Sequence, residues 1–322
     1  MTYSRIVGTG RYLPERIMTN FELEKIVDTT DEWIRTRTGV ERRHVVAEDQ
    51  TTSDMCVEAA KKAIEDAGVD VSDIDLVITG TTSPDLIFPN VSTLIQHRLG
   101  IPACTAFSLE AACTGFIYAL TMADKFIRLG DAKCALVIGA ECITKLMDWK
   151  DRNTCVLFGD GAGAVIVKPS EEPGILSTHL GADGQYRDLL YYPVGASNQL
   201  AKAGTDEAAI QMTGSEVFKV AVKTLGGIAA ETLEKAGIDK DELDWLIPHQ
   251  ANIRIIQATA KRLDLPMEKV ILTVQDHGNT SAASVPMALD VGIRDGRVKK
   301  GQLVLMEAFG GGFTWGSILL KF

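Results

Sequence analysis

The chain contains Ala63-Ile-Glu-Asp-Ala-Gly-Val-Asp70 and then Ile74-Asp-Leu-Val-Ile78, and this pattern returns as Thr232-Leu-Glu-Lys-Ala-Gly-Ile-Asp239 and Leu243-Asp-Trp-Leu-Ile247. In both copies, apolar residues at helical spacing end at a glycine, and a short apolar run typical of a buried strand follows. Ile64 and Leu233 are equivalent, so the two copies lie 169 residues apart. A single repeat of this length indicates a duplicated domain and not a solenoid of short repeats.

The duplication extends to two further pairs of stretches: 135–138 with 302–305, and 163–168 with 316–321. Because helices alternate with short apolar strands, we expect an α/β protein with parallel strands joined by helices that cover both faces of each sheet. We place the two halves at 1–171 and 172–322, with a boundary near Pro169–Pro173. The polar stretch 195–209 predicts an exposed loop in the second half.

Composition excludes several classes of protein. The 322 residues are 46% hydrophobic and 24% charged, which is typical of a globular protein and not of a disordered one. A formal net charge of -10 argues against nucleic acid or an anionic membrane surface as a partner. The uncharged stretch Ala111–Ala123 has 13 residues, and a membrane span needs roughly 18 to 20. We therefore expect neither a nucleic-acid partner nor a membrane partner.

The cysteines and the N-terminal residues bear on the compartment. The six cysteines include no C-x-x-C pair, so we expect reduced thiols rather than a disulfide framework or a metal site. The stretch MTYSRIVGTG lacks the basic and apolar segments of a secretory signal. Both features favour a cytoplasmic protein.

Cys113 is the first candidate for chemistry. It lies in Glu110-Ala-Ala-Cys-Thr-Gly115, between the expected strand Cys104–Leu109 and a helix whose apolar spacing runs from Phe116 to Ile127. A thiol at such a corner meets the free amides of the helix, which lower its pKa from about 8.5 and favour a nucleophile. The alternative is a buried cysteine that serves only as a small apolar side chain.

His249 and Asn279 are the second and third candidates. His249 follows the expected strand Trp245–Ile247, at the carboxyl end where open α/β sheets place ligands. Asn279 follows an expected strand at Lys269–Val274. An offset of 167 residues pairs Cys113 with Thr280. We therefore expect the two helix starts to face each other near a pseudo-twofold axis.

Two glycine-rich stretches offer other interpretations. Phe158-Gly-Asp-Gly-Ala-Gly163 precedes an expected strand at 164–167, whereas a dinucleotide loop must open a helix. A nucleotide site is therefore disfavoured. Gly310–Gly312 lies between two expected strands, so it is either a tight bend or a close approach of backbone to a ligand.

Two other functions fit some of these residues. A cysteine, a histidine and an asparagine also occur in this order in papain-like hydrolases, but the C-G-S-C-W type of sequence is missing and the duplicated α/β pattern does not suit that fold. A non-catalytic acyl-binding module would have no use for a corner thiol combined with His and Asn. Alkylation of Cys113 with loss of turnover would separate an enzyme from a binding module.

The whole chain resembles the β-ketoacyl-acyl-carrier-protein synthase III family, condensing enzymes that start bacterial type II fatty acid synthesis. The resemblance rests on these stretches: Thr29-Thr-Asp-Glu-Trp-Ile34, Thr36-Arg-Thr-Gly39, Ala111-Ala-Cys-Thr-Gly-Phe116, Phe158-Gly-Asp-Gly-Ala-Gly163, Pro248-His-Gln-Ala-Asn252, His277-Gly-Asn-Thr-Ser-Ala-Ala283 and Glu307-Ala-Phe-Gly-Gly-Gly312. It implies the thiolase fold, with two βαβαβαββ halves in a layered αβαβα architecture. A synthase III-like paralogue that makes another β-keto product has the same Cys, His and Asn and stays an alternative.

The resemblance also implies a reaction. Cys113 takes the acyl group of acetyl-CoA, malonyl-acyl carrier protein loses carbon dioxide, and the carbanion attacks the acyl thioester to give acetoacetyl-acyl carrier protein. Neutral His249 and Asn279 stabilise the enolate oxygen, and the backbone amides of Cys113 and Gly311 hold the other oxyanion. The reaction needs no cofactor and no metal, since acyl-CoA is a substrate.

Further residues receive roles by the same resemblance. Trp33 and Arg152 would sandwich the adenine of CoA, with Arg37 and Thr29 near its phosphate end, and the pantetheine channel would be lined by Gly214, Phe218, Ala251 and Asn252. Phe88 would cross from the partner subunit of a homodimer and close the acyl pocket, so that acetyl or propionyl primers are preferred over branched or long ones.

A basic helix face predicts where acyl carrier protein docks. Arg254, Lys261 and Arg262 fall on one face of the expected helix after His249, and 253–263 contains no acidic residue. Lys219 joins this surface by family resemblance.

Overall fold

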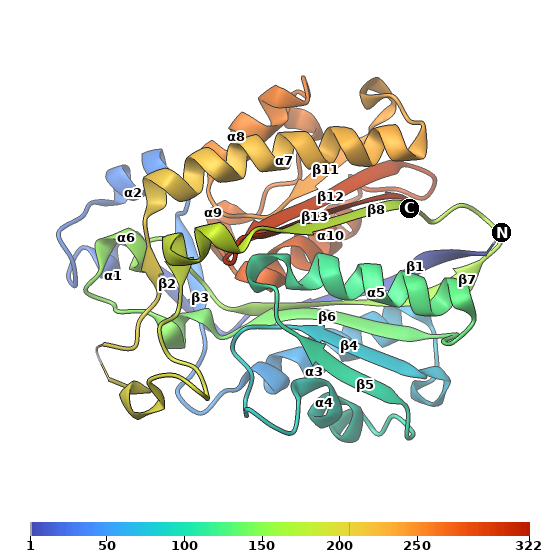
Figure 1. Ribbon diagram of the computed structural model, residues 1–322, viewed down its shortest axis with the longest axis horizontal. Helices are drawn as coiled ribbons and strands as arrows, with labels where there is room; N and C mark the ends of the chain where they lie inside the picture. The colour runs from blue at the N-terminus through green and yellow to red at the C-terminus, as the bar shows by residue number, and fades with distance from the viewer. Residues whose placement is uncertain (1, 206) are drawn as a thin grey trace.

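The computed structural model describes residues 2–205 and 207–322 and contains two main sheets, each covered by helices on both faces (Figure 1). In the first sheet β4, β5 and β6 are parallel, while β7 is antiparallel to both β6 and β1. Its strands, in spatial order, are β1 (Tyr3–Tyr12), β7 (Gly161–Ser170), β6 (Ala135–Glu141), β4 (Leu76–Gly80) and β5 (Thr105–Leu109). The expectation of parallel strands therefore holds for the interior and fails at one edge.

The second sheet has the order β11 (Trp245–Pro248), β12 (Leu303–Gly310), β13 (Thr314–Lys321) and β8 (Ile175–Ala182). Here β11 and β12 are parallel, and β13 is antiparallel to both of its neighbours. Four short strands form two separate pairs: β2 (Arg16–Thr19) with β3 (Arg42–Val45), and β9 (Leu190–Tyr191) with β10 (Gln211–Met212).

The expected strand Lys269–Val274 is wrong. Only Val270 forms a bridge, to Leu246 on β11, and the short helix α9 (Val274–His277) begins where the strand was predicted to end. The buried side chain of Gln250 explains the loss, because it takes the hydrogen bonds that a neighbouring strand would provide. Its oxygen accepts from the backbone N–H groups of residues 273 and 274, and its amide donates to two backbone carbonyls.

The glycines of the repeat end the two helices that precede the central strands. Helix α3 (Thr52–Ala67) begins at Thr51, whose side chain accepts from the backbone of Asp54, and ends at Gly68 with φ +62°. Helix α7 (Gly214–Ala236) ends at Gly237 with φ +67°. Glycine adopts this left-handed conformation without the clash that a Cβ brings.

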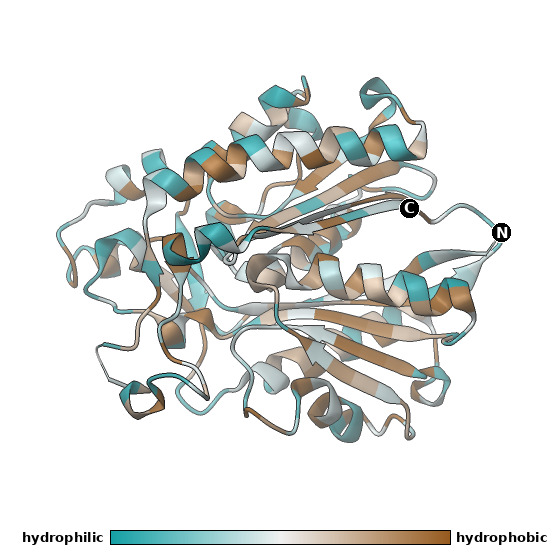
Figure 2. Cartoon of the chain, viewed as in Figure 1, coloured by the Kyte–Doolittle hydropathy of each residue, from teal (hydrophilic) through white to brown (hydrophobic). Residues whose placement is uncertain are grey.

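The helices form three layers around the two sheets (Figure 1). Helix α3 and α4 (Val91–Leu99) pack on the outer face of the first sheet, and α7 and α8 (Ile253–Arg262) lie over the second. Helices α5 (Gly115–Leu129) and α10 (Ser284–Arg294) lie between the sheets and contact strands of both. In Figure 2 the hydrophobic colour follows the strands, whereas the outer helices alternate between hydrophobic and hydrophilic turns. The layered αβαβα architecture is confirmed.

The chain changes sheet between β7, which ends at Ser170, and β8, which begins at Ile175. The halves do not pack separately, because an early segment crosses over. Residues 16–45, which include α1 (Asn20–Leu23) and α2 (Asp31–Thr38), share a hydrophobic core with Leu246 and Ile256 of the second half. The division at 171 and 172 is thus a division of sequence, and we keep it as a proposal for the units of duplication.

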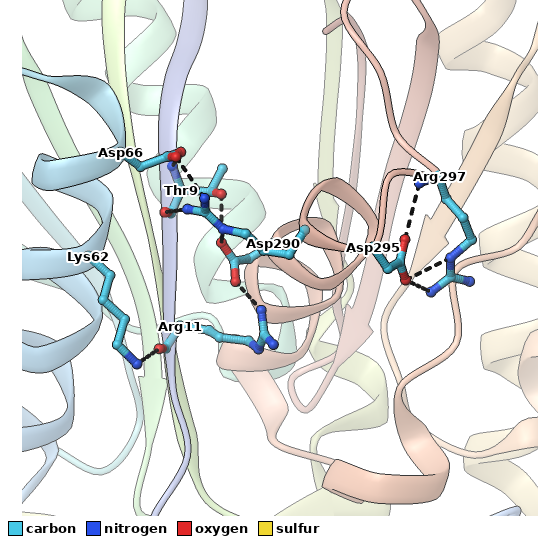
Figure 3. Close-up of polar contacts among 8 residues, drawn as sticks. Thr9, Arg11, Lys62, Asp66, Asp290, Asp295 and Arg297 are labelled. Carbon is cyan, nitrogen blue, oxygen red and sulfur yellow. Dashed lines mark hydrogen bonds and ion pairs between the residues drawn. The ribbon is translucent and has the colours of Figure 1, made fainter.

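Polar contacts also join the halves, between α10 and the first sheet (Figure 3). The buried carboxylate of Asp290 accepts from Thr9 Oγ1 at 2.7 Å and pairs with the Arg11 guanidinium on β1. Arg294, one turn later, pairs with Asp66 of α3 at 2.8 Å and donates to the carbonyl of Thr9 at 2.9 Å. Because these partners lie far apart in sequence, the contacts fix α10 against the first half.

The stretch 195–209 is exposed at nearly every described position, as expected, apart from its last residues, and position 206 lies outside the described residues. No helix within 2–205 or 207–322 combines the length and apolarity that crossing a membrane requires.

Candidate active site

Cys113 lies where the first sheet hands over to a central helix. After β5 the chain makes a short 3₁₀ turn, Ala112–Thr114, and α5 follows at once. Ala112 has φ +46°, a left-handed conformation that is strained for a residue with a Cβ and is common at functional sites. Strand β12 approaches so closely that a Cβ on Gly310 would lie 2.6 Å from the Cys113 nitrogen. Glycine is therefore required at position 310.

The thiol does not have the lowered pKa that the helix start predicts. Cys113 is buried, and desolvation raises the pKa of its thiol to about 12, although a hydrogen bond from Ser281 opposes this shift. Burial penalises the thiolate more than the helix end stabilises it. Acylation therefore requires a group that removes the proton.

The pseudo-symmetric counterpart of the Cys113 turn is the 3₁₀ turn Ser281–Ala283, which leads into α10. Ser281 has φ +48°, like Ala112, and α5 and α10 begin 169 residues apart. Cys113 is therefore equivalent to Ala282, and the pairing with Thr280 is wrong. The offset of 167 belongs to the strands that follow, since α5 has 15 residues and α10 only 11. The two turns do face each other, because the Cβ of Ala282 would lie 3.3 Å from a Cβ on Gly115.

His249 is held as a neutral hydrogen-bond donor. Its ring is buried, and desolvation lowers its pKa to about 3. Ser284 Oγ accepts from the backbone N–H of Gln250 at 3.4 Å and lies 2.6 Å from His249 Nδ1. The hydroxyl proton is thus free to bind Nδ1, which leaves the ring hydrogen on Nε2.

Asn279 is oriented in a similar way by its own turn. Its Oδ1 accepts from the backbone N–H of Ser281 at 2.9 Å, so the amide NH₂ group is left to donate. Its backbone is tied to the strand-like segment before β7, since Asn279 N–H donates to Leu157 and its carbonyl accepts from Gly159. The two donors are thus fixed before any substrate binds.

Two cavities meet at Cys113. The narrower one, of about 160 Å³, is lined by Cys113, His249 and Asn279 together with the four predicted pantetheine residues, Gly214, Phe218, Ala251 and Asn252. The wider one, of about 460 Å³, contains Cys113, Gly311 and the side chains of Ile143, Leu146 and Ile210. Asn252 also begins α8, because its Oδ1 accepts from the backbone of Ile255 at 3.0 Å. A thioester carbonyl at Cys113 would therefore have a cavity on each side.

Comparison with known proteins decides the family. Residues 107–184 match the family 3-Oxoacyl-[acyl-carrier-protein (ACP)] synthase III, and residues 233–322 match the C-terminal part of the same family. Over all 322 residues the chain is 61% identical to the Beta-ketoacyl-[acyl-carrier-protein] synthase III of Thioalkalivibrio sulfidiphilus, with 100% of both chains covered. The chain belongs to the β-ketoacyl-[acyl-carrier-protein] synthase III family.

Solved structures agree with this assignment. The 3-oxoacyl-[acyl-carrier-protein] synthase III of Aquifex aeolicus is 48% identical, with a TM-score of 0.93 over 99% of this chain and 100% of that one. The priming β-ketosynthase of the R1128 polyketide pathway is 39% identical, with a TM-score of 0.94 over 99% and 96%. The thiolase fold expected from sequence is confirmed.

The four residues assigned to the nucleotide end of CoA lie together, outside both cavities of the synthase III site. The Arg152 guanidinium lies 5.0 Å from the centre of the Trp33 ring, and that of Arg37 lies 5.9 Å from it. Arg152 also donates to the carbonyl of Asp28 at 3.0 Å, and Thr29 Oγ1 is buried with no partner among the described residues. Since Arg152 stacks directly on Trp33, an adenine enters between them only if the arginine moves away.

Phe88 does not lie in the acyl cavity of its own chain. Its side chain is 83% exposed, and the adjacent Ile87 is 68% exposed. A synthase III chain taken alone therefore has an open acyl cavity, and the gating role of Phe88 requires a second subunit.

The four predicted docking cations are exposed but not equivalent. The Arg254 guanidinium lies 5.4 Å from the Phe218 ring, at the wall of the narrow cavity. Lys219 pairs with Glu216 at 2.8 Å, which offsets its charge, and Arg262 donates to the carbonyl of Val222. Lys261 is exposed on the same helix.

Three residues of the site were missed by sequence reasoning. Ser284 orients His249, Ser281 orients Asn279 and bonds the thiol, and Glu141 accepts from Ser281. Ser281 belongs to a stretch that carried the family resemblance, so its motif was a signal. Nothing local marks Glu141, which is the last residue of an apolar strand.

Proposed function

We propose that this chain condenses acetyl-CoA with malonyl-acyl carrier protein and forms acetoacetyl-acyl carrier protein, carbon dioxide and CoA through an acyl-Cys113 intermediate. The observation that carries the proposal is the meeting of Cys113, His249 and Asn279 where two cavities join. Membership of the synthase III family at 61% identity supports the same reaction.

In the first half-reaction the Cys113 sulfur attacks the thioester carbonyl of acetyl-CoA. The pantetheine arm lies in the narrow cavity and the acetyl group enters the wide one. The carbonyl oxygen becomes negative in the tetrahedral intermediate, and the backbone N–H groups of Cys113 and Gly311 stabilise it. The C–S bond to CoA then breaks, so that CoA leaves with the proton that the thiol lost.

In the second half-reaction malonyl-acyl carrier protein takes the place of CoA. Loss of carbon dioxide leaves an electron pair on the methylene carbon, so no strong base is needed to make the nucleophile. His249 and Asn279 donate to the enolate oxygen, and the carbon attacks the acyl-Cys113 carbonyl. The thiolate is released as acetoacetyl-acyl carrier protein forms.

We also propose a cytoplasmic homodimer. Strand β5 is an edge strand of the first sheet, and the exposed apolar side chains of Leu86, Ile87 and Phe88 lie in the loop before α4. Burial of such a patch against a second copy is the usual way to protect it. Phe88 of the partner subunit would then limit the acyl cavity to acetyl or propionyl groups. A product other than acetoacetyl-acyl carrier protein is less favoured, because the polyketide priming enzyme is less similar to this chain than its fatty acid relatives are.

Separation of the half-reactions tests the proposal. Cys113→Ala should abolish both acylation by labelled acetyl-CoA and condensation, because no nucleophile remains. His249→Ala and Asn279→Ala should still become labelled but should lose malonyl decarboxylation by about 10² to 10³. A variant of His249 or Asn279 that condenses at the native rate contradicts the assigned roles.

A further inference from the structure

Glu141 is a buried carboxyl group that the proposed mechanism leaves without a role. It ends β6, is fully buried, and accepts hydrogen bonds from two sides. From the turn after β4, Thr82 donates its backbone N–H at 3.1 Å and its hydroxyl at 3.0 Å, and Ser83 Oγ donates at 2.5 Å. From the turn before α10, Ser281 Oγ donates at 3.2 Å. The carboxyl group thus joins two turns of the site.

Ser281 connects this carboxyl group to the reacting sulfur. Its hydroxyl donates to Glu141 Oε1 and is also hydrogen-bonded to the Cys113 thiol, and both Ser281 and Cys113 line the wide cavity. The left-handed φ of Ser281 aims the side chain into this position. A hydroxyl group that accepts from one partner and donates to another passes a proton without moving its heavy atoms.

The site requires a proton acceptor of this kind. Burial raises the pKa of the Cys113 thiol to about 12, so the reactive thiolate does not form unaided at neutral pH. Burial lowers the pKa of His249 to about 3, and its Nδ1 is occupied by Ser284, so the imidazole is a poor base. Burial raises the pKa of Glu141 to about 7, which suits a group that accepts and returns a proton near neutral pH.

We propose that Ser281 and Glu141 form a proton relay that takes up the thiol proton of Cys113 during acylation. The S–H proton passes to Ser281 Oγ as the Ser281 proton passes to Glu141 Oε1, and the sulfur electron pair forms the bond to the acyl carbon. When the C–S bond to CoA breaks, the proton returns by the same path to the CoA sulfur. Ser281 touches the reacting sulfur and is a catalytic residue, whereas Glu141 acts through Ser281 and is a positioning residue. The relay rests on the proposed function.

The surroundings of Glu141 contain few other groups that titrate. The thiols of Cys113, Cys56 and Cys142 face it, and burial raises the pKa of each, so these thiols stay protonated through the neutral range. The remaining contacts are hydroxyls of residues 81–83 and Ser281. No lysine, arginine or histidine of 2–205 or 207–322 hydrogen-bonds the carboxyl group. A pH profile near 7 therefore reports this carboxyl group.

The test follows single-turnover transfer of labelled acetyl from acetyl-CoA to Cys113 between pH 5 and 9. In the native protein the rate should rise with a midpoint near pH 7. Glu141→Gln should lose this rise and should be about 10² to 10⁴ slower at pH 7.5, with KM for acetyl-CoA unchanged. Ser281→Ala should show the same loss, and Glu141→Asp, which keeps a carboxyl group, should recover part of the rise.

Asp160→Asn is the matched control. Asp160 is also a buried carboxyl group with its pKa raised by burial, to about 6, but it accepts from Thr144 and Val46 and makes no contact with the thiol. This variant should keep the native pH profile even where it loses thermal stability. Malonyl decarboxylation, which transfers no thiol proton, should be unchanged in Glu141→Gln.

The outcomes separate the relay from the proposed function. Native protein that takes no label from acetyl-CoA contradicts the proposed function itself. Native protein that is labelled, together with a Glu141→Gln or Ser281→Ala variant that keeps the rise near pH 7, overturns the relay alone. If Glu141→Gln does not fold, the solvent isotope effect of the native protein decides: the relay requires two protons in flight, and a one-proton inventory rejects it.

Discussion

At the scale of single residues, Glu307 on β12 lies beside His249 and has an unusual environment. Both carboxylate oxygens are buried, and neither has a hydrogen-bond partner among the described residues. Desolvation raises the pKa of Glu307 from 4.5 to about 8. Between these two values the folded chain binds the proton that the unfolded chain has lost. The free energy of unfolding therefore falls as pH rises through this window.

Glu307→Gln should remove this dependence. We expect the variant to be more stable than the native chain at pH 9 by about 1 to 3 kcal/mol, because a buried charge without a partner is eliminated. Near pH 5 the two proteins should differ little. Urea unfolding at both pH values measures the effect, with the exposed Glu172→Gln as control. Native and variant stabilities that run parallel from pH 5 to 9 would show that Glu307 is not the titrating group.

At the scale of elements, Asp290 fixes α10 against the first sheet (Figure 3). Asp290→Ala leaves Arg11 without its carboxylate and Thr9 Oγ1 without its acceptor, inside the contact between the halves. We expect a loss of about 3 kcal/mol in the free energy of unfolding, since removal of one partner of a buried ion pair leaves the other unpaired.

Asp295→Ala is the control for this change. Asp295 lies one turn past Asp290 and pairs with Arg297 at 2.6 Å, but both side chains are partly exposed. Its loss should lower stability by less than about 1 kcal/mol. Chemical denaturation of both variants measures the difference. Equal losses would mean that the contact between α10 and β1 does not depend on the buried charge.

At the scale of the whole molecule, the basic face of α8 is a local exception in a chain of net charge -10. Arg254→Glu should raise KM for malonyl-acyl carrier protein strongly at low ionic strength and less at high, because steering of an acidic partner is screened by salt. Acylation by acetyl-CoA should change much less, since no protein partner takes part.

Two controls separate docking from damage to the cavity. Arg254 also lies over Phe218, so Lys261→Glu, which reverses a charge on the same helix without that contact, should give the same salt dependence. Lys133→Glu, just before β6, should have no effect. Equal losses with malonyl-CoA and malonyl-acyl carrier protein as donors would assign Arg254 to the pantetheine channel and reject docking.

Local sequence was enough to predict the duplication, the layered α/β fold and the corner that carries Cys113. These features depend on the spacing of apolar residues and on glycines at helix ends, and both act over a few neighbouring residues. The motifs around Cys113, His249 and Asn279 were likewise sufficient to identify the synthase III family.

Tertiary structure alone decided the properties that depend on burial and on distant partners. The Cys113 thiol has a raised pKa because the whole fold removes water from it, which outweighs the local effect of the helix start. The strand expected at 269–274 is reduced to one bridge because Gln250 takes its hydrogen bonds. Glu141 reaches the thiol only because β6 and the Ser281 turn, 140 residues apart, pack together. Residue spacing along the chain carries no record of such contacts, since desolvation and hydrogen bonding act through space.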